Sequence, residues 1–364
     1  MQSCFTAGWI ILWITKIAND KGAVHRCFKK IEIITTSDIP YTKMKIKTLV
    51  TGAAGFIGSH LVDRLLESGA EVVGIDNMKL GRHENLTKAL QNKLFRFIVA
   101  DVNDIQTCST LVAEETKHAP FDMIWHLAAN SDIRTGSVDF DIDLRDTFLT
   151  THNLLKVLRQ YKIKRLAFAS TSAIYGVQST LLTEDMGPLF PISNYGAMKL
   201  ASEAAITAAL ESYLEKVWIF RFPNVVGERS THGAVYDFAM KLKKNPRELE
   251  VLGDGSQEKP YFHVSELIDA MLFIVDNAQE RLNYFNIGTA DSSTTVRYLA
   301  ETVVKRMSPN AKIRYTGGSR GWVGDVPKFN YSIEKLKKLG WIPRLTSNQA
   351  VNQAVEEIVG EVCR

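Results

Sequence analysis

The sequence predicts an α/β fold: a doubly wound parallel sheet with a smaller C-terminal lobe. From Lys45 onward, short segments that are apolar on both faces alternate with helical stretches, as in parallel sheets covered by helices on both sides. The first of these segments runs into a glycine-rich turn and a helix, which places ligands at the carboxyl ends of the strands. Strands are expected at residues 48–51, 71–76, 95–100, 123–127, 165–170 and 217–222.

The turn after the first strand is suited to a pyrophosphate. Gly52, Gly55 and Gly58 follow one another at intervals of three residues. The first allows a sharp turn, the second lets the backbone approach the phosphates, and the third lets the helix pack closely on the strand. The start of the helix then offers N–H groups and a partial positive charge. The first gap is one residue wider than in the commonest dinucleotide motif, so the glycines alone are weak evidence.

Asp76 strengthens the dinucleotide interpretation. It ends the second expected strand, roughly 20 residues after the glycines, where an acid can hydrogen-bond both ribose hydroxyls of the adenosine half. A 2′-phosphate would meet the charge of this carboxylate, so NAD is favoured over NADP. The alternative is a glycine turn of another α/β protein followed by a surface aspartate.

The regular alternation ends after Pro223. Helices are expected at residues 235–244, 265–277, 296–307 and 333–339, separated by Gly, Pro and Asp. We therefore divide the chain into an N-terminal extension (1–44), a dinucleotide-binding domain (45–222) that includes the catalytic helix described below, and a region that is mainly a substrate-binding lobe (223–364). A crevice between two lobes is the usual place for a small ligand.

Composition limits the partners of this 364-residue chain. Its net charge is +4, from 44 basic and 40 acidic residues, and no basic run suggests a nucleic-acid site. The four cysteines are scattered, which favours reduced thiols in a cytoplasmic protein and no metal site. The apolar run at residues 7–14 is far short of the ~20 residues of a membrane span, and no Lys or Arg precedes it as in a signal peptide. A weak membrane or partner anchor in the extension remains the alternative to a dispensable segment.

Tyr195 and Lys199 are the candidate catalytic pair. They stand four residues apart in an alanine-rich helical stretch, so their side chains share a face. An ammonium group near a phenol lowers the pKa of the phenol, which would make Tyr195 a base near neutral pH. The alternative is an ordinary helix-surface pair, and Tyr41 with Lys45 shows the same spacing upstream of any possible site. Hydroxyl groups at 170–172, after a buried strand, favour the catalytic interpretation.

At this point the chain resembles the extended short-chain dehydrogenase/reductase family, in particular its nucleotide-sugar 4-epimerases. The resemblance covers roughly residues 45–364 and rests on segments 51–58, 76–77, 101–102, 126–129, 170–176, 221–227 and 253–264, together with Tyr195 and Lys199. It implies a Rossmann domain, bound NAD, a nucleoside-diphosphate sugar as substrate and, by analogy, a homodimer formed through two helices of the outer layer.

The resemblance also implies roles for individual residues. Thr171 would orient the substrate oxygen, Tyr195 would be the base, and Lys199 would hold the nicotinamide ribose. Asn224 and Lys259 would bind the pyrophosphate, and Asp325 would lie near the nucleotide. The implied cofactor-binding residues are Gly52, Gly55, Phe56, Ile57, Gly58, Asp76, Asn77, Asp101, Val102, Leu127, Ala128, Ala129, Ser170, Tyr195, Lys199 and Phe222.

The chain departs from the family pattern at several positions. Lys259 stands where a two-pronged arginine is usual, so pyrophosphate binding should survive with looser geometry. Trp322 replaces an arginine three residues before Asp325, which leaves recognition of the base open. Asp146 and Thr147 occupy the positions where an asparagine is usual.

The expected activity is NAD-dependent epimerisation of a nucleoside-diphosphate sugar at C4 through a transient 4-keto sugar. The alternatives are a nucleotide-sugar dehydrogenase, a ketosugar reductase or a dehydratase on the same scaffold, and more remotely a non-catalytic nucleotide-binding protein. Dehydratases and decarboxylases of the family carry acids at the positions of Ser172 and Ala173, which here cannot take a proton from carbon. Elimination would need a base from elsewhere, with Glu184 or Asp185 first in question.

Removing residues 1–43 should leave fold and activity intact, because the first expected strand begins after Met44. The measurement is the melting temperature and turnover of the truncated protein beside the full chain. A truncated protein that is insoluble or inactive would show that the extension is structural.

Overall fold

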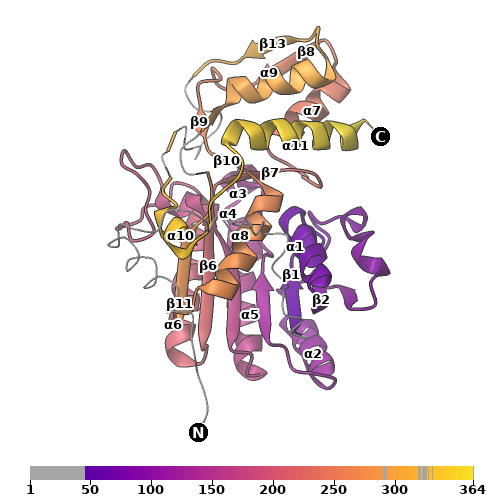
Figure 1. Cartoon of the computed structure of the whole chain (residues 1–364), viewed down its shortest axis with the longest axis vertical. Coiled ribbons are helices and arrows are strands. Elements are labelled where there is room, and N and C mark those ends of the chain that lie inside the picture. The colour runs from indigo at the N-terminus through magenta and orange to yellow at the C-terminus, as the bar shows by residue number, and fades with distance from the viewer. Residues whose placement is uncertain are drawn as a thin grey trace, which may run out of the picture. The chain divides into compact units, whose positions relative to one another are not determined.

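A seven-stranded sheet forms the centre of the fold (Figure 1). The computed structural model describes residues 46–289, 293–318, 321, 326, 328–329 and 331–363. The strand order is β11–β6–β5–β4–β1–β2–β3, and every neighbouring pair is parallel. This confirms the predicted fold class. The strands are β1 (Lys47–Thr51), β2 (Glu71–Asp76), β3 (Phe95–Val99), β4 (Met123–His126), β5 (Arg165–Thr171), β6 (Lys216–Phe222) and β11 (Leu282–Asn286).

The sequence analysis missed the seventh strand. The six predicted strands are present with ends shifted by one residue at most, but β11 also joins the sheet beside β6, pairing Leu282 with Val217. The chain therefore returns to the sheet after it has entered the C-terminal region. The division at residue 222 stays a prediction, and the sheet itself crosses it.

The order of the strands places a switch point between β1 and β4. From β1 the chain builds outward through β2 and β3, and from β4 it builds in the opposite direction through β5 and β6. At the carboxyl ends of β1 and β4, the loops that follow the two strands therefore run in opposite directions. A crevice opens between these loops. In doubly wound sheets this is where ligands bind.

Helices cover both faces of the sheet because successive strand residues point to opposite sides. Val50 of β1 packs in the core under α1 and α8, whereas its neighbour Leu49 packs in the core under α2, α5 and α6. Both residues are buried, which explains why the strands are apolar throughout. The helices of this part are α1 (Phe56–Glu67), α2 (Ile105–Thr116), α3 (Ile133–Val138), α4 (Phe140–Asp143), α5 (Thr150–Gln160), α6 (Asn194–Ser212) and α8 (Val264–Asn277). A π-helical turn, Leu144–Leu149, joins α4 to α5.

The C-terminal lobe has its own core. Apolar residues of α7 (Ala234–Lys244), α9 (Val296–Met307) and α11 (Ser347–Val362) form it, and these three helices pack on one another. The expected helix at 296–307 matches α9, and the one at 333–339 is α10 (Glu334–Leu339). Short strands complete the lobe and its connections: β7 (Asn224–Val226), β8 (Glu248–Val251), β9 (Glu258–Lys259), β10 (Tyr261–His263), β12 (Thr294–Thr295) and β13 (Lys312–Tyr315).

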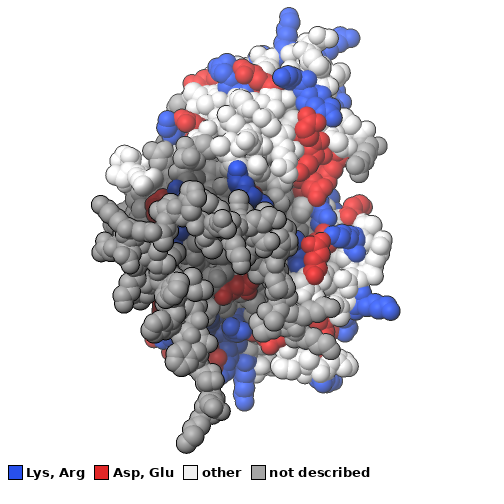
Figure 2. Space-filling view, viewed as in Figure 1, with Lys and Arg blue, Asp and Glu red and all other residues white. Residues whose placement is uncertain are grey.

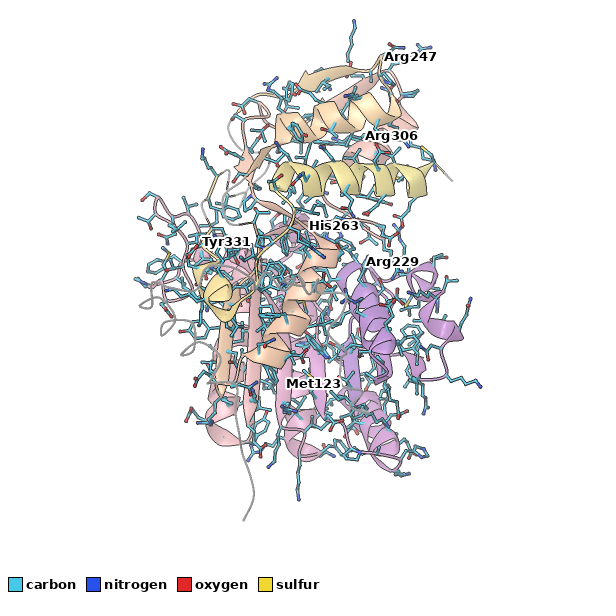
Figure 3. All side chains as sticks on the ribbon, in the orientation of Figure 1. Met123, Arg229, Arg247, His263, Arg306 and Tyr331 are labelled. Atoms are coloured by element: carbon cyan, nitrogen blue, oxygen red, sulfur yellow. The ribbon has the colours of Figure 1, made fainter. Side chains whose placement is uncertain are left out.

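Polar contacts lie where the lobe meets the sheet layer. Arg229, in the loop after β7, donates to Asp63 of α1 at 2.8 Å, and His263 contacts Glu357 of α11 at 3.0 Å. Figure 3 shows Arg229 and His263 between the helices of the lobe and those that cover the sheet. These contacts hold the two walls of the crevice at a defined separation.

The described surface carries charges of both signs. Figure 2 shows basic and acidic side chains interspersed over the described part of this face. In the described ranges no helix has the length and apolar character needed to cross a bilayer.

The contact between β1 and α1 leaves no room for a side chain at Gly58. A Cβ there would lie 1.9 Å from the carbonyl oxygen of Gly52 and 2.8 Å from its carbonyl carbon. Both are backbone atoms, which cannot move aside as a flexible side chain could. The close packing expected of this glycine is therefore a steric requirement.

Replacing Gly58 with Ala should push α1 away from β1 and destabilise the protein by at least 1–3 kcal/mol, roughly the cost of overpacking a core. Thermal or denaturant unfolding measures this. Gly360→Ala is the matched control, because no atom lies within 4 Å of that Cβ and an alanine inside α11 should stabilise by up to ~1 kcal/mol. Equal stabilities for the two variants would contradict the steric argument.

Candidate active site

A cavity of about 1100 Å³ lies between the carboxyl ends of the strands and the lobe. Its walls come from the β1–α1 turn, from the ends of β2, β4 and β5, and from α6 on one side, and from β7, β9 and α7 on the other. The structure brings almost all the sequence-predicted residues to it. Those that line the cavity are Gly52, Gly55, Phe56, Ile57, Gly58, Asp76, Asn77, Asp101, Val102, Leu127, Ala128, Ala129, Thr171, Tyr195, Lys199, Phe222, Asn224 and Lys259.

Two predicted residues are exceptions. The side chain of Ser170 does not line the cavity, because its hydroxyl is buried and donates to Glu203 of α6. Asp325 lies outside the described residues. The Ser170 side chain thus supports the catalytic helix from behind, and the contact of Ser170 with the cofactor stays a prediction.

The glycine turn fits a dinucleotide. Gly52 has φ +74°, and a Cβ there would lie 2.9 Å from the backbone nitrogen of Ala128. No side chain caps α1 at Gly55, and Phe56 and Ile57 at the start of the helix line the cavity. The turn therefore presents bare backbone and a helix N-terminus to the space where a pyrophosphate would lie.

Asp76 is held beside this turn. Its carboxylate is largely buried, and its two oxygens accept hydrogen bonds from the backbone N–H groups of Ala54 (3.0 Å) and Met78 (2.8 Å). Burial raises the pKa of Asp76, and the hydrogen bonds from the backbone oppose that rise. A carboxylate fixed in this way has lone pairs left for ribose hydroxyls and would repel a 2′-phosphate.

The neighbouring wall carries polar groups in fixed positions. Asn77 donates from Nδ2 to Asp101 at 3.0 Å, and Lys79 donates to Asp146 at 3.0 Å. Asp146, one of the two residues that replace the usual asparagine, lines the cavity and is neutralised by Lys79 and Arg145. The other, Thr147, is buried and accepts a hydrogen bond from the backbone N–H of Asn130.

Tyr195, Lys199 and Thr171 come together at the carboxyl end of β5. The Thr171 hydroxyl lies near the Tyr195 phenol and lowers its pKa, and the Thr171 oxygen accepts a hydrogen bond from the backbone N–H of Ala173 at 3.1 Å. The ammonium of Lys199 donates to the carbonyl of Ala169 at 2.7 Å and lies 5.8 Å from the centre of the Tyr195 ring. The pairing on one helix face is as predicted.

The pKa of Tyr195 is raised in the protein by itself, so the predicted net lowering of this pKa is wrong there. Burial raises the pKa of Tyr195, the negative charge of Asp143 raises it further, and only the hydrogen bond to Thr171 lowers it. Burial also lowers the pKa of Lys199 to about 7, so a smaller fraction of this side chain is protonated near neutral pH. The four-residue spacing predicted correctly that Tyr195 and Lys199 share a helix face. It did not reveal that burial disfavours the charged form of both side chains.

A buried ion pair that sequence reasoning missed supports the catalytic helix. Glu203 of α6 accepts two hydrogen bonds from the guanidinium of Arg221, at 3.0 and 2.7 Å. Arg221 also donates to the Tyr175 hydroxyl at 3.0 Å, and Tyr175 donates to Asn286 of β11 at 2.7 Å. The signal available in the sequence was the four-residue spacing from Lys199 to Glu203.

His126 also has a role that its motif did not suggest. It is fully buried between the Thr51 and Thr151 hydroxyls, at 2.7 and 3.1 Å, and burial lowers its pKa to about 3. A neutral imidazole in this position ties β1, β4 and α5 together below the cavity. It does not line the cavity.

No acid stands beside the hydroxyl pair at the positions that follow Thr171. Ser172 and Ala173 line the cavity. Glu184 is buried and accepts from the backbone N–H of Asn286 at 3.0 Å, and Asp185 accepts from the Tyr284 hydroxyl at 2.5 Å. Neither of these two acids lines the cavity. Among the described residues, no group of three His, Cys, Asp or Glu side chains is arranged to hold a metal ion.

Comparison with known proteins agrees with this geometry. Residues 48–288 match the model of the NAD dependent epimerase/dehydratase family. The chain is 29% identical to a UDP-glucose 4-epimerase of Mycolicibacterium smegmatis, covering 85% of this chain and 98% of that one. It is 28% identical to UDP-glucuronic acid decarboxylase 1 of Arabidopsis thaliana, covering 86% of this chain and 70% of the other.

A solved structure extends the likeness to three dimensions. The UDP-glucose 4-epimerase of Thermotoga maritima, determined with UDP-glucose, superposes with a TM-score of 0.77 at 29% identity, over 87% of this chain and all of that one. The glycine turn, the Tyr195–Lys199 pair and the shared sheet thus agree with a match that spans most of the chain. The chain belongs to the NAD-dependent epimerase/dehydratase family.

Proposed function

We propose that this protein inverts C4 of a nucleoside-diphosphate sugar through a transient 4-keto sugar. The observation that carries the proposal is a contrast within one wall of the cavity. Thr171, Tyr195 and Lys199 provide what is needed to move a proton at a sugar hydroxyl, whereas Ser172 and Ala173 provide nothing that removes a proton from carbon.

The proton step belongs to Tyr195 and Thr171. The Thr171 hydroxyl, held by Ala173, orients the C4 oxygen of the sugar. Tyr195 then acts in its phenolate form, and its oxygen takes the proton of the C4 hydroxyl. Bound NAD supplies the acceptor for the C4 hydride and the donor for its return. Lys199 holds the ribose next to the nicotinamide, and its positive charge stabilises the phenolate. In the return step Tyr195 gives the proton back, so the reaction is redox-neutral overall.

Two residues of the opposite wall anchor the diphosphate. Asn224 begins β7 and Lys259 ends β9, and both line the cavity. An amide and a compact ammonium bind phosphate oxygens without the two-pronged geometry of an arginine. An anchor at the diphosphate leaves the sugar free to turn, as it must if the hydride is to return to the other face of C4. The role of Asp325 at the nucleotide stays a prediction.

Decarboxylation and dehydration are the competing activities, since decarboxylases are among the relatives. Both need an acid or base beside C5 of the keto sugar. Glu184 and Asp185 are occupied by hydrogen bonds elsewhere, which supports epimerisation over both alternatives. A net dehydrogenase or ketosugar reductase would differ by steady consumption of free NAD or NADH.

Homodimerisation through helices of the outer layer and a cytoplasmic location also stay predictions. Sedimentation of the purified protein gives the oligomeric state directly.

Incubation with a panel of UDP- and other nucleoside-diphosphate sugars, with NAD well below the sugar concentration, should give C4 epimers as the main products. Chromatography against standards identifies them. A 4-keto-6-deoxy sugar or carbon dioxide as the main product would contradict the proposal, and accumulation of NADH in proportion to product would favour the dehydrogenase. Tyr195→Phe should lower turnover by about 10²–10⁴, whereas Tyr161→Phe, away from the cavity, should not.

Asp76 should set the choice of cofactor. Replacing it with Ala removes hydrogen bonds to the ribose and the charge that repels a 2′-phosphate, so we expect NAD to bind about 10- to 100-fold more weakly and the preference over NADP to shrink. Calorimetric titration of both cofactors measures this. Glu84→Gln, an exposed change nearby, is the control. An unchanged ratio of the two affinities would remove Asp76 from cofactor selection.

A further inference from the structure

A buried carboxylate behind the catalytic pair has no part in the mechanism described so far. Asp143 ends α4, where the chain widens into the π-helical turn, and its side chain has no exposed surface. Its Oδ1 accepts a hydrogen bond from Nδ2 of Asn130 at 2.8 Å. Its Oδ2 is buried and has no hydrogen-bond partner among the residues that the structure describes. Such an atom is costly to bury, so its presence needs a reason.

The surrounding backbone is shaped to admit this carboxylate. A Cβ on Gly136 would lie 1.9 Å from Oδ2 of Asp143, so the glycine leaves the space that the oxygen occupies. The carbonyl of the same Gly136 accepts a hydrogen bond from Nδ2 of Asn194 at 2.8 Å, and Asn194 directly precedes Tyr195. Helices α3 and α4 both pack on α6. Asp143 is therefore built into the support of the first turn of the catalytic helix.

Asp143 forms no ion pair with a described basic side chain. Glu203 raises the pKa of Lys199 more than Asp143 does, but it is also held by two guanidinium nitrogens of Arg221 and by Ser170. Within the described ranges, no Lys, Arg or His lies within ion-pair distance of Asp143. The titratable or charged groups that act with it across this site are Asp132, Asp146, Lys199 and Tyr195.

We propose that Asp143 is a positioning residue whose buried carboxylate supplies, together with Glu203, the negative charge that keeps Lys199 protonated beside Tyr195. The inference rests on the proposed function only in taking Tyr195 and Lys199 as the proton-transfer pair. Burial alone drives Lys199 towards its neutral form, and a neutral amine would neither stabilise a phenolate nor donate three hydrogen bonds. Burial raises the pKa of the Asp143 carboxyl, and the charge of Lys199 opposes that rise. In its ionised form this carboxylate offsets the tendency of Lys199 to lose its proton, and it does not line the cavity.

The sign of the effect follows from the charges. The negative charge of Asp143 raises the pKa of Lys199 and also that of Tyr195. Removing it should lower both values. Lys199 would then lose its proton below its present pKa of about 7, and Tyr195 would ionise more easily. The pH range in which Lys199 is charged and Tyr195 can accept a proton moves to lower pH as a whole.

Asp143→Asn tests this with nearly unchanged volume, and Asp141→Asn, on the exposed side of the same helix, is the matched control. Competitive acetylation with acetic anhydride over a range of pH, read by mass spectrometry, gives the titration of Lys199 against the exposed Lys93 in the same sample. We expect the Lys199 midpoint to fall by about half a pH unit or more in Asp143→Asn and to stay in place in Asp141→Asn. An unchanged midpoint in Asp143→Asn would overturn the proposal.

The pH profile of turnover is the second readout. Both limbs of the profile should move to lower pH in Asp143→Asn, whereas a purely structural defect would lower the rate at every pH without moving the limbs. Immobile limbs would contradict the charge role. If Asp143→Asn folds poorly, Asp143→Ser removes the charge without placing an amide against Gly136. The acetylation titration needs no turnover, so it decides on Asp143 even if the epimerase proposal fails.

Discussion

The buried ion pair between Glu203 and Arg221 is the interaction on which the site depends. It connects α6, which carries Tyr195 and Lys199, to β6 in the sheet, and Ser170 of β5 adds a hydroxyl to the same carboxylate. Removing one partner from such a pair costs about 3–5 kcal/mol, because it leaves an uncompensated buried charge. The pair therefore acts as a positional constraint. A catalytic helix held only by apolar contacts could slide, whereas this one is located by directional bonds.

The consequence reaches beyond α6. Through Tyr175 the same guanidinium is linked to Asn286 at the end of β11, so the edge strand and the catalytic helix share one polar network. The network lies beneath the hydroxyl pair and does not line the cavity with a charge of its own.

The fold was largely predictable because hydrophobic period and glycine chemistry are local properties. Strands that are buried on both faces must be apolar throughout, and the six predicted ones lie within one residue of their places. β11 was missed for a physical reason: its sequence, Leu282–Asn286, carries two asparagines and follows a region without regular alternation. Both asparagines are satisfied by partners far along the chain, Asn283 by the carbonyl of Val217 and Asn286 by Tyr175. No local pattern could show that.

The same distinction applies to the site. Motif residues such as Gly52, Asp76 and Tyr195 were found because their function requires a fixed spacing. Asp143 and Arg221 were not recognised as parts of the site, because their importance arises from burial and from partners that the spacing does not reveal. The sign of the pKa shift at Tyr195 was missed for the same reason, since burial outweighs the effect of a neighbouring charge. Sequence patterns identify the residue types that a reaction needs, but they do not show how deeply those residues are buried.

The return of the chain to the sheet at β11 makes the two halves of the molecule topologically interleaved. The lobe begins with β7 before the sheet is finished, and after α8 and β11 have completed the sheet the chain goes back to build α9 and α11. The substrate lobe therefore cannot be cut out at one junction, and a chimera with a relative's lobe would need at least two crossover points. During synthesis, β6 must wait as an exposed edge until residue 286 has emerged, so the last strand of the cofactor domain forms only after part of the substrate lobe exists.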